Sequence, residues 1–454
     1  MTQNLFNEVE IAAAKPSEGQ PIPVEVGGIP RLRIPVRDQK VFTVESLDDQ
    51  LAFDHEARAV WVFVCKLDLS ALIMRVKSVE GQAGRDANDP RLLLSLWIYA
   101  TLRGVDSARE LHILCDESRP YRWLCGGVSM NYHSLASFRS ENGAVLRDLR
   151  IQVVAILMHA GLVTLDVVAQ DGMKVRASAG KSSFRREASL EECLAAARAQ
   201  VETLETTPAP ELDKRRQAAQ ARAAREKVER VTAALKNLEK LTQQKEAKKN
   251  GTGNTARAST TDPDAHVVKF SDGGYRPGYN VQFAIDSGSG VIVGVHVTNA
   301  GNDFGQMSPM LRQIEDSTGQ PVKALAVDCG YSTPDDIEAV EVEHGTTLYI
   351  PIKDRARKEK KGLDIYARLK VDTDATAACR ARMATPEAQE IYKLRGQTAE
   401  LINAQARNRN FWFMPVRGLI KTAAVAELFA LAHNIDRAVK LLFTLQAKLA
   451  PKIC

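Results

Sequence analysis

The stretch that decides the fold is LVTLDVVAQDGMKVRA at residues 162–177. Its opening residues, 162–168, are rich in β-branched side chains and therefore predict a β-strand. The run leads into Gln-Asp171-Gly, so we expect an acidic residue just after the end of this strand. A carboxylate in that place is a candidate for chemistry, although Asp is also a common turn former.

A second α/β block begins at residue 279. Residues 279–285 and 291–297, joined by Gly-Ser-Gly, predict a β-hairpin. The pattern then predicts a helix at 307–314, a strand at 322–327 ending in Asp328, a helix at 335–343, a strand at 347–352 and a helix at 386–407. With the segment between the two blocks removed, the order is strand, strand, strand, helix, strand, helix, strand, helix. That order matches an α/β RNase H-like core.

The segment between the blocks changes composition abruptly to Ala, Glu, Arg, Lys and Leu. Apolar residues in steps of three and four form one seam over 190–204 and another over 228–238, and Pro208-Ala-Pro210 separates the two arms. This pattern predicts an antiparallel helical hairpin insert at 188–261, with a flexible return at 250–261. Residues 211–249 hold twelve basic and six acidic residues, which favours a solvated helical face, with a DNA-tracking arm as the alternative.

The remaining regions complete the expected organisation. Residues 1–40 contain five prolines and little periodic hydrophobicity, so they form an extended or disordered leader. Residues 41–160 have a helical pattern and form an all-α N-terminal domain. The catalytic domain is expected to comprise 161–187 and 262–440, and 441–454 a C-terminal tail.

Composition permits several partners and excludes others. The chain has 454 residues, 61 Lys and Arg against 56 Asp and Glu, and a formal charge of +5, which is permissive for nucleic acid but does not establish it. The seven scattered cysteines form no CxxC pair, so neither a disulfide framework nor a zinc cluster is indicated. No apolar run approaches the roughly 20 residues of a membrane span, and the N-terminus lacks a signal-peptide pattern. We therefore expect a cytoplasmic protein.

Three carboxylates carry the chemical hypothesis. Phosphodiester cleavage needs an activated water and a stabilised leaving oxygen, and two Mg²⁺ ions about 3.5–4 Å apart can provide both. Mg²⁺ takes hard oxygen ligands. Asp171 and Asp328 follow predicted strands and Glu400 lies on a predicted helix, so all three can converge on one site.

The blocks around these residues resemble the catalytic segments of DDE transposases from bacterial insertion sequences. The three blocks are Gln-Asp171-Gly-Met-Lys-Val-Arg-Ala, Val-Asp328-Cys-Gly-Tyr-Ser, and Tyr392-Lys-Leu-Arg ahead of Glu400. The similarity covers about 90–440. It includes the helical segments at 89–99, 102–111 and 137–139, together with Thr-Asp-Pro-Asp at 261–264, Tyr-Asn-Val-Gln at 279–282 and Arg-Gly-Leu-Ile-Lys at 417–421.

The resemblance implies that Asp171, Asp328 and Glu400 bind the metal ions. It also implies that the spacing of Tyr392, Arg395 and Glu400 is the family's signature around its catalytic glutamate. Arg407 stands where that signature carries a Lys, and an Arg there can contact a DNA phosphate through two hydrogen bonds. Many relatives have Phe-Gly soon after the glutamate, whereas this chain has Leu-Ile-Asn-Ala at 401–404. The register of the glutamate is thus left open. The alternative glutamates are Glu387, Glu390 and Glu427.

Other residues are second-rank candidates. Asp286 and Asp303 also follow predicted strands, so each could assist metal binding. Lys174, Arg176 and Arg395 either contact phosphate or are ordinary surface cations. Trp412, in Phe-Trp-Phe at 411–413, either stacks on a splayed DNA base or packs against the catalytic sheet.

Two other site types are excluded by spacing. Gly172 and the Gly180-Lys-Ser fragment are separated by seven residues, whereas a P-loop needs four. The eight histidines show neither H-x₃-H nor H-E-x-x-H spacing, so no zinc hydrolase ligand set is present.

The sequence therefore predicts an RNase H-like catalytic core with a helical hairpin insert, preceded by a helical DNA-binding domain. The expected function is DNA transposition, in which two Mg²⁺ ions, or Mn²⁺, support cleavage at the element ends and strand transfer into target DNA. The expected partners are double-stranded terminal repeats, target DNA and a second copy of the chain in a homodimer, with association to the bacterial nucleoid. The alternatives are a structure-selective nuclease of the same fold and an inactive, transposase-derived repressor.

Overall fold

The computed structural model describes residues 44–78, 86–206, 214–247, 251–352, 355–362 and 364–449. The expected leader and the Pro-rich tip of the insert lie outside these ranges. The chain divides into two units, Met1–Gln50 and Leu51–Cys454, and every element described below belongs to the second.

The N-terminal part of this unit is entirely helical, as the sequence predicts. Its elements are α2 (Glu56–Val64), α3 (Ser70–Ile73), α4 (Pro90–Leu102), α5 (Ala108–Glu117), α6 (Arg119–Cys125), α7 (Tyr132–Glu141) and α8 (Gly143–His159). The central helix α4 is buried along almost its whole length. Asp89 caps its first turn by accepting a hydrogen bond from the Arg91 amide, and Pro90 begins the helix, where its missing N–H costs nothing.

The catalytic sheet has six strands. They are β1 (Val168–Arg176), β4 (His266–Lys269), β5 (Tyr275–Asp286), β6 (Ile292–Thr298), β7 (Ala324–Ala326) and β8 (Thr347–Tyr349). The order is β4-β5-β1-β7-β8. β4 pairs with residues 275–278 of β5, and β6 pairs with residues 280–285 of the same strand. β5 is antiparallel to β1, β4 and β6, whereas β1, β7 and β8 are parallel to one another. The predicted succession is thus confirmed for β1, β5, β6, β7 and β8, whereas β4 was not predicted.

The predicted position of the first strand is wrong. The β-branched run at 162–167 is a connection in which only Val163 and Leu165 are buried, and β1 begins only at Val168. Leu165 has a φ of 57°, which interrupts an extended conformation. The more polar residues that follow form the ladder with β5 instead, so Asp171 lies within β1 and not after its end.

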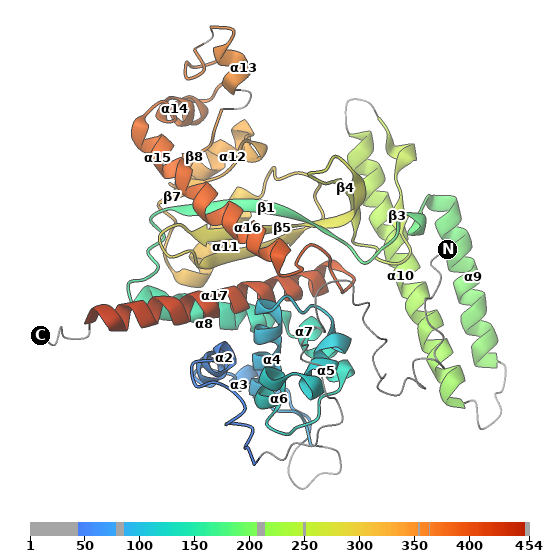
Figure 1. The fold of residues 1–454 in the computed structure, drawn as a ribbon. Helices are drawn as coiled ribbons and strands as arrows, with labels where there is room; N and C mark the ends of the chain where they lie inside the picture. The colour runs from blue at the N-terminus through green and yellow to red at the C-terminus, as the bar shows by residue number, and fades with distance from the viewer. Residues whose placement is uncertain are drawn as a thin grey trace, which may run out of the picture. The chain divides into compact units, whose positions relative to one another are not determined.

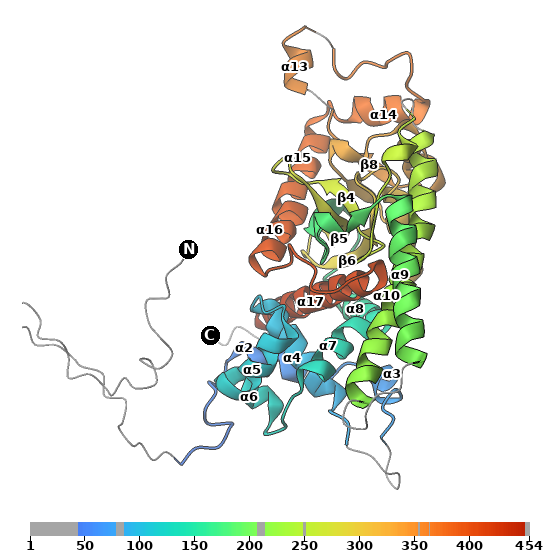
Figure 2. The ribbon, with the colours of Figure 1, turned by 90° about the vertical axis from the view of Figure 1, so that its right-hand side faces the viewer.

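Helices cover both faces of the sheet (Figures 1 and 2). One face of the sheet is covered by α11 (Met307–Thr318) and by α12 (Pro334–Glu338) with η5 (Ala339–Glu343). Buried side chains of these helices pack with those of the sheet in one hydrophobic core. Residues of η6 (Gly396–Glu400) and α16 (Leu401–Asn408) pack on the other face. The long helix α17 (Leu419–Leu449) packs on β6 and on the N-terminal helices, and it continues past residue 440, where the tail was expected to begin. The remaining elements include η1 (Lys181–Ser183), η4 (Cys329–Tyr331), α13 (Arg355–Glu359), α14 (Asp374–Arg382) and α15 (Pro386–Arg395).

A helical hairpin interrupts the sheet between β1 and β5, as predicted. Its arms are α9 (Glu187–Thr206) and α10 (Lys214–Glu246), beside the sheet in Figure 1. The return was expected to be flexible. It contains η3 (Gly253–Thr255) and β3 (Ala258–Ser259), which pairs with β2 (Phe184–Arg185) where the chain leaves the sheet. Small apolar side chains of the return pack against the hairpin seam, which holds it in place.

Candidate active site

Strand register places the two aspartates next to each other. β1 and β7 are parallel, with Ala169 paired with Ala326. Asp171 and Asp328 each come two residues later in their own chains. β7 ends at Ala326 while β1 continues, so the two carboxylates lie where the edge of β1 becomes open.

The third carboxylate comes from a helical segment over the same face of the sheet. α15, η6 and α16 follow one another without a break, and η6 is a π turn. A π turn is closed by a backbone hydrogen bond between residues five apart in the sequence, and such turns often occur at functional sites. Ala399 and Ile402 pack into the sheet core, which fixes the segment on that face. Glu400 lies between them in sequence, with its side chain largely exposed.

Arg395 joins all three carboxylates. Its Nη1 donates to Glu400 Oε1 at 2.8 Å. Its Nη2 lies 3.1 Å from Asp171 Oδ1 and 4.0 Å from Asp328 Oδ2. The side chain of Arg395 is 9% exposed, against 40% for that of Asp328 and 59% for that of Glu400. The structure therefore brings Asp171, Asp328 and Glu400 together around one buried cation. The side chains of Asp328 and Glu400 are on the solvent side of this cluster.

Neighbouring donors orient the aspartates. Asn403 Nδ2 donates to Asp171 Oδ2 at 2.9 Å, and the Gly172 amide donates to Asp171 Oδ1 at 3.0 Å. The Gly330 amide donates to Asp328 Oδ1 at 2.6 Å. Sequence reasoning missed Asn403, whose signal was its position one turn beyond Glu400 on the same helix.

Burial and charge act against each other at this site. Burial raises the pKa of Asp171, and the charge of Arg395 opposes that rise. Burial alone would lower the pKa of Arg395, but Asp171 and the other nearby acidic groups hold it above its usual value. Burial also raises the pKa of Tyr392, which lies beside Arg395. The guanidinium thus stays charged and compensates the buried carboxylate.

The donor set fits a divalent cation in chemistry. It consists of carboxylate oxygens from two strands and a helix, the hard ligands that Mg²⁺ and Mn²⁺ prefer. In the described ranges, no group of three His, Cys, Asp or Glu residues lies close enough together to hold a metal ion. The reason is visible in the contacts, because the Arg395 guanidinium lies between the three carboxylates.

Two family models match this chain. The transposase DDE domain matches residues 252–435, and a transposase domain of the DUF772 type matches residues 45–141. Together they cover more than half of the sequence. The chain belongs to the DDE transposases of insertion sequences. Comparison with curated proteins and with solved structures gave no match.

Membership in this family confirms the RNase H-like fold and indicates an enzyme of DNA transposition. Enzymes of this family bind DNA and generally use divalent metal ions. The first carboxylate, Asp171, lies before the matched DDE segment, whereas Asp328 and Glu400 lie inside it. None of the helices in the described ranges is both long and apolar enough to cross a membrane.

The opposite face of β1 carries a polar network centred on Asp303. Asp303 Oδ1 accepts from Lys174 Nζ at 3.2 Å, and from Asn280 Nδ2 and Gln282 Nε2 at 2.7 Å each. Gln282 Oε1 accepts in turn from the Tyr331 hydroxyl, three residues after Asp328. Burial lowers the pKa of Lys174 and raises that of Tyr331. The network therefore connects β1 and β5 to the loop that presents Asp328.

The alternative acidic residues lie in other environments. Asp286 is buried and accepts from the amide and hydroxyl of Ser289, so it closes the β5–β6 turn. Glu427 is buried in an ion pair with Arg150, at 2.7 Å. Glu390 forms an exposed ion pair with Lys393 on the outer side of α15. Glu387 lies in the first turn of the same helix.

The candidate DNA contacts divide into buried and exposed groups. Arg395 is buried and Lys174 is half-buried, and each forms the ion pairs described above. Arg176 is exposed at the end of β1, with its guanidinium 5.7 Å from the ring centroid of Trp412, which is 46% exposed. Arg407 is exposed in the last turn of α16. Arg176, Trp412 and Arg407 are therefore the members of the set that are open to a DNA strand.

The Thr-Asp-Pro-Asp motif has a structural role. Asp262 Oδ1 accepts from the Tyr279 hydroxyl at 2.7 Å and from the Gly418 amide at 3.1 Å. Asp264 accepts from the Leu419 amide, at the start of α17, and from Asn237 of α10. The two aspartates thus join the base of the hairpin to β5 and α17.

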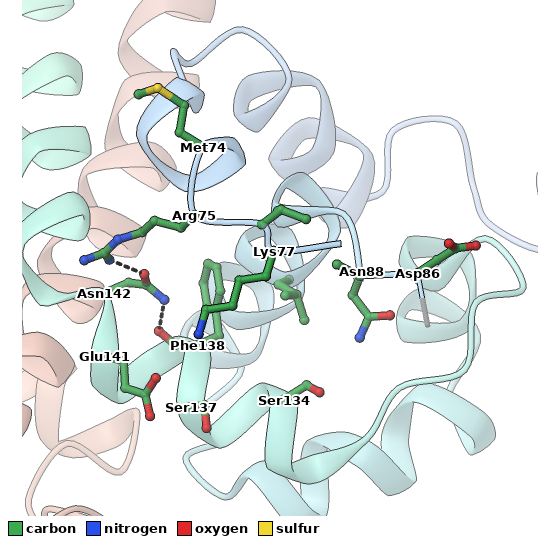
Figure 3. Close-up of a pocket in the computed structure, with 13 residues that line it drawn as sticks. Met74, Arg75, Lys77, Asp86, Asn88, Ser134, Ser137, Phe138, Glu141 and Asn142 are labelled. Atoms are coloured by element: carbon green, nitrogen blue, oxygen red, sulfur yellow. Dashed lines mark hydrogen bonds between the residues drawn. The ribbon is translucent and has the colours of Figure 1, made fainter. Parts of the chain in front are cut away.

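A pocket of about 970 Å³ lies in the helical N-terminal region, away from the carboxylates (Figure 3). Arg75 and Lys77 line one side of it, and Ser134 and Ser137 of α7 line another. Arg75 donates to Asn142 at 2.7 Å, which fixes its guanidinium at the end of α7. The pocket is lined by two cations, Arg75 and Lys77, and by two acids, Asp86 and Glu141, beside short polar side chains of α7.

Proposed function

We propose that the protein is an active transposase that cleaves the ends of an insertion sequence and joins the freed 3′ ends to target DNA. Asp171, Asp328 and Glu400 are the proposed metal ligands, with two Mg²⁺ ions as the cofactor and Mn²⁺ as a substitute. The observation that carries this proposal is the convergence of three carboxylates from β1, the end of β7 and η6 on the single guanidinium of Arg395.

When bound, divalent ions of this kind lower the pKa of a water molecule and stabilise charge on the leaving oxygen. The chain's own residues orient the ligands. Asn403 and the Gly172 amide hold the two oxygens of Asp171, and the Gly330 amide holds Asp328. Cleavage and joining are both in-line displacements at phosphorus, so one site serves both steps without a covalent enzyme intermediate.

We propose that DNA is bound by exposed residues around this site and by the helical N-terminal region. Arg176, Trp412 and Arg407 are placed to contact the strand that enters the site, through phosphate contacts and base stacking. In the N-terminal region, Arg75 and Lys77 beside α7 form the proposed phosphate contacts. Joining two element ends requires two active sites, so the working form is a homodimer on DNA.

The test is Mg²⁺-dependent cleavage of a duplex that carries the inverted repeat flanking the gene. Wild type, Asp328→Asn and the matched control Asp335→Asn are compared, because Asp335 is an exposed aspartate in the first turn of α12. We expect the control to cleave like wild type, and Asp328→Asn to bind the duplex and not cleave it. Mn²⁺ binding, followed by electron paramagnetic resonance, is expected to weaken only in Asp328→Asn.

The other outcomes identify the alternatives. Binding without cleavage by wild type would replace the proposal with a transposase-derived repressor. Cleavage of branched DNA irrespective of the repeat, without joining, would identify a nuclease of the same fold. Equal cleavage by Asp328→Asn and wild type would remove Asp328 from the metal site.

A further inference from the structure

The helical hairpin has two arms of opposite charge. α10 holds ten Lys and Arg against four Glu, whereas α9 holds one Arg against five Glu. The excess of six positive charges on α10 exceeds the +5 of the whole chain. The basic residues are therefore concentrated on one helix.

The two arms bury a single narrow seam. Leu190 of α9 packs with Val231, Ala234 and Leu238 of α10, and Leu194 of α9 packs against this cluster. An α-helix turns about 100° per residue, so a residue nine positions from Val231 points to the opposite side. Arg222 is nine positions from Val231 and is exposed. The face of α10 opposite the seam is thus directed away from α9.

A regular set of cations occupies that outward face. Arg215, Arg222 and Lys236 are separated by multiples of seven residues, which is close to two helical turns per step, and Lys240 lies one turn beyond. We call these four residues the outer stripe. All four are exposed, and none has an ion-pair partner within the part of the chain that the structure describes. Glu229 interrupts the series, and Glu226, which pairs with Arg230, lies at the edge of the same face.

Other cations of α10 are neutralised within the hairpin. Arg225 pairs with Glu205 of α9 at 2.6 Å, and Arg230 pairs with Glu226 at 3.6 Å. One pair with α9 and one pair within α10 therefore offset two of the ten cations, and the outer stripe keeps its charge. This division distinguishes the stripe from a helix face on which charges of both signs alternate.

The dimensions and composition of the stripe fit the backbone of duplex DNA. Twenty-five residues separate its ends, which is about 37 Å along a helix, and one turn of B-DNA is about 34 Å. None of the exposed large hydrophobic side chains recorded for the described residues belongs to α9 or α10. A membrane surface or an apolar protein groove would require such side chains. A row of cations without them suits phosphates, which are bound without regard to sequence.

We propose that the outer stripe of α10 contacts the phosphates of duplex DNA and adds sequence-independent affinity next to the catalytic sheet. The base of the hairpin is fixed for this role, because Asn237 of α10 donates to Pro263 O and to Asp264 Oδ1 at 3.1 and 3.2 Å. This inference rests on the proposed handling of DNA and adds a surface that the active site does not include.

The test uses the salt dependence of binding to a duplex without the inverted repeat, followed by fluorescence anisotropy. The full-length variants are Arg222→Gln, the triple variant Arg215→Gln/Arg222→Gln/Lys236→Gln, and the control Arg198→Gln, which removes one exposed cation from α9. Each lost phosphate contact is expected to reduce the slope of log K against log salt by about 0.9, so the triple variant loses about 2.7. The control is expected to match wild type, and Arg222→Lys is expected to restore the slope of the single variant.

The outcomes separate this inference from the proposed function. If wild type binds DNA and the triple variant has the same slope, the stripe is not a DNA surface, although the catalytic proposal stands. An equal loss in Arg198→Gln would also overturn the inference, because it would show a general effect of net charge. Failure of wild type to bind any duplex would refute the proposed function itself. Thermal unfolding of each variant establishes that it is folded, which we expect because all four substituted residues are exposed.

Discussion

His433 is expected to make the stability of the protein depend on pH. It lies on α17, is 2% exposed, and its Nε2 is 2.9 Å from the Gly290 carbonyl oxygen in the turn between β5 and β6. The other ring nitrogen has no partner among the described residues. Burial lowers the pKa of His433 to about 4, so the folded protein holds the ring neutral at pH 7 and Nε2 donates its proton to Gly290.

The sign and size of the effect follow from proton linkage. The unfolded chain has a His pKa of about 6.5 and binds a proton at pH 5, whereas the folded chain does not. The unfolded state therefore binds more protons, and stability falls as the pH falls between about 6.5 and 4. For these two pKa values, the free energy of unfolding contributed by His433 falls by about 2 kcal/mol between pH 7 and pH 5.

The assay compares wild type with His433→Gln, which keeps a neutral donor near Gly290. Urea unfolding is measured at pH 7, 6 and 5, and the difference between the two proteins removes the contributions of all other titrating groups. We expect wild type to lose about 2 kcal/mol more than the variant over this range. Parallel curves for the two proteins would refute the reasoning and show that His433 is protonated in the folded state or reached by solvent.

Three further predictions concern packing and DNA contact. Gly172→Ala is expected to destabilise the fold by about 1–3 kcal/mol, because an added methyl group would overlap the Asp303 carboxylate, and chemical denaturation measures the loss. Arg150→Leu is expected to cost about 3–5 kcal/mol, since it leaves buried Glu427 without its partner, and a loss below about 1 kcal/mol would contradict this. Trp412→Ala is expected to weaken binding of a frayed DNA end by about 1–3 kcal/mol, and equal binding by variant and wild type would contradict the stacking role.

The sequence was sufficient to predict five of the six strands of the sheet in their order along the chain, because each has a pattern within its own segment, and it missed β4. The β-hairpin at β5 and β6, the strand before Asp328 and the helix that carries Glu400 each have a local signal. The beginning of β1 could not be read in this way. Residues 162–167 are rich in β-branched side chains, but residues 168–176 are the ones that pair with β5. Which residues pair is a property of the tertiary structure and not of the local pattern.

The site was predictable in its acidic residues and not in its cation. Arg395 was one of several exposed-looking basic residues in the sequence, yet it is buried and contacts all three carboxylates. That contact depends on the π turn between Arg395 and Glu400, and no residue pattern in the sequence predicted this turn. Similarly, Asp303 follows a strand like the other candidates, but it contacts Lys174 of β1 and Gln282 of β5. The alternation of side chains along these strands places both partners on the face of the sheet opposite Asp171.

The position of the hairpin explains why the core could be recognised despite an insert of about a sixth of the chain. β1 and β5 are antiparallel neighbours, paired from Val168 with Asp286 to Arg176 with Gly278. The insert therefore replaces the turn between two adjacent strands, where its ends are already close together and its length costs little additional closure entropy. β2 and β3 pair where the insert leaves and returns, and Asp262 and Asp264 anchor its base. Asp171 lies five residues before the end of β1, so the hairpin extends from a strand that also carries a residue of the proposed active site. An arm attached in this way can change in length or charge without altering the register that places Asp171 beside Asp328.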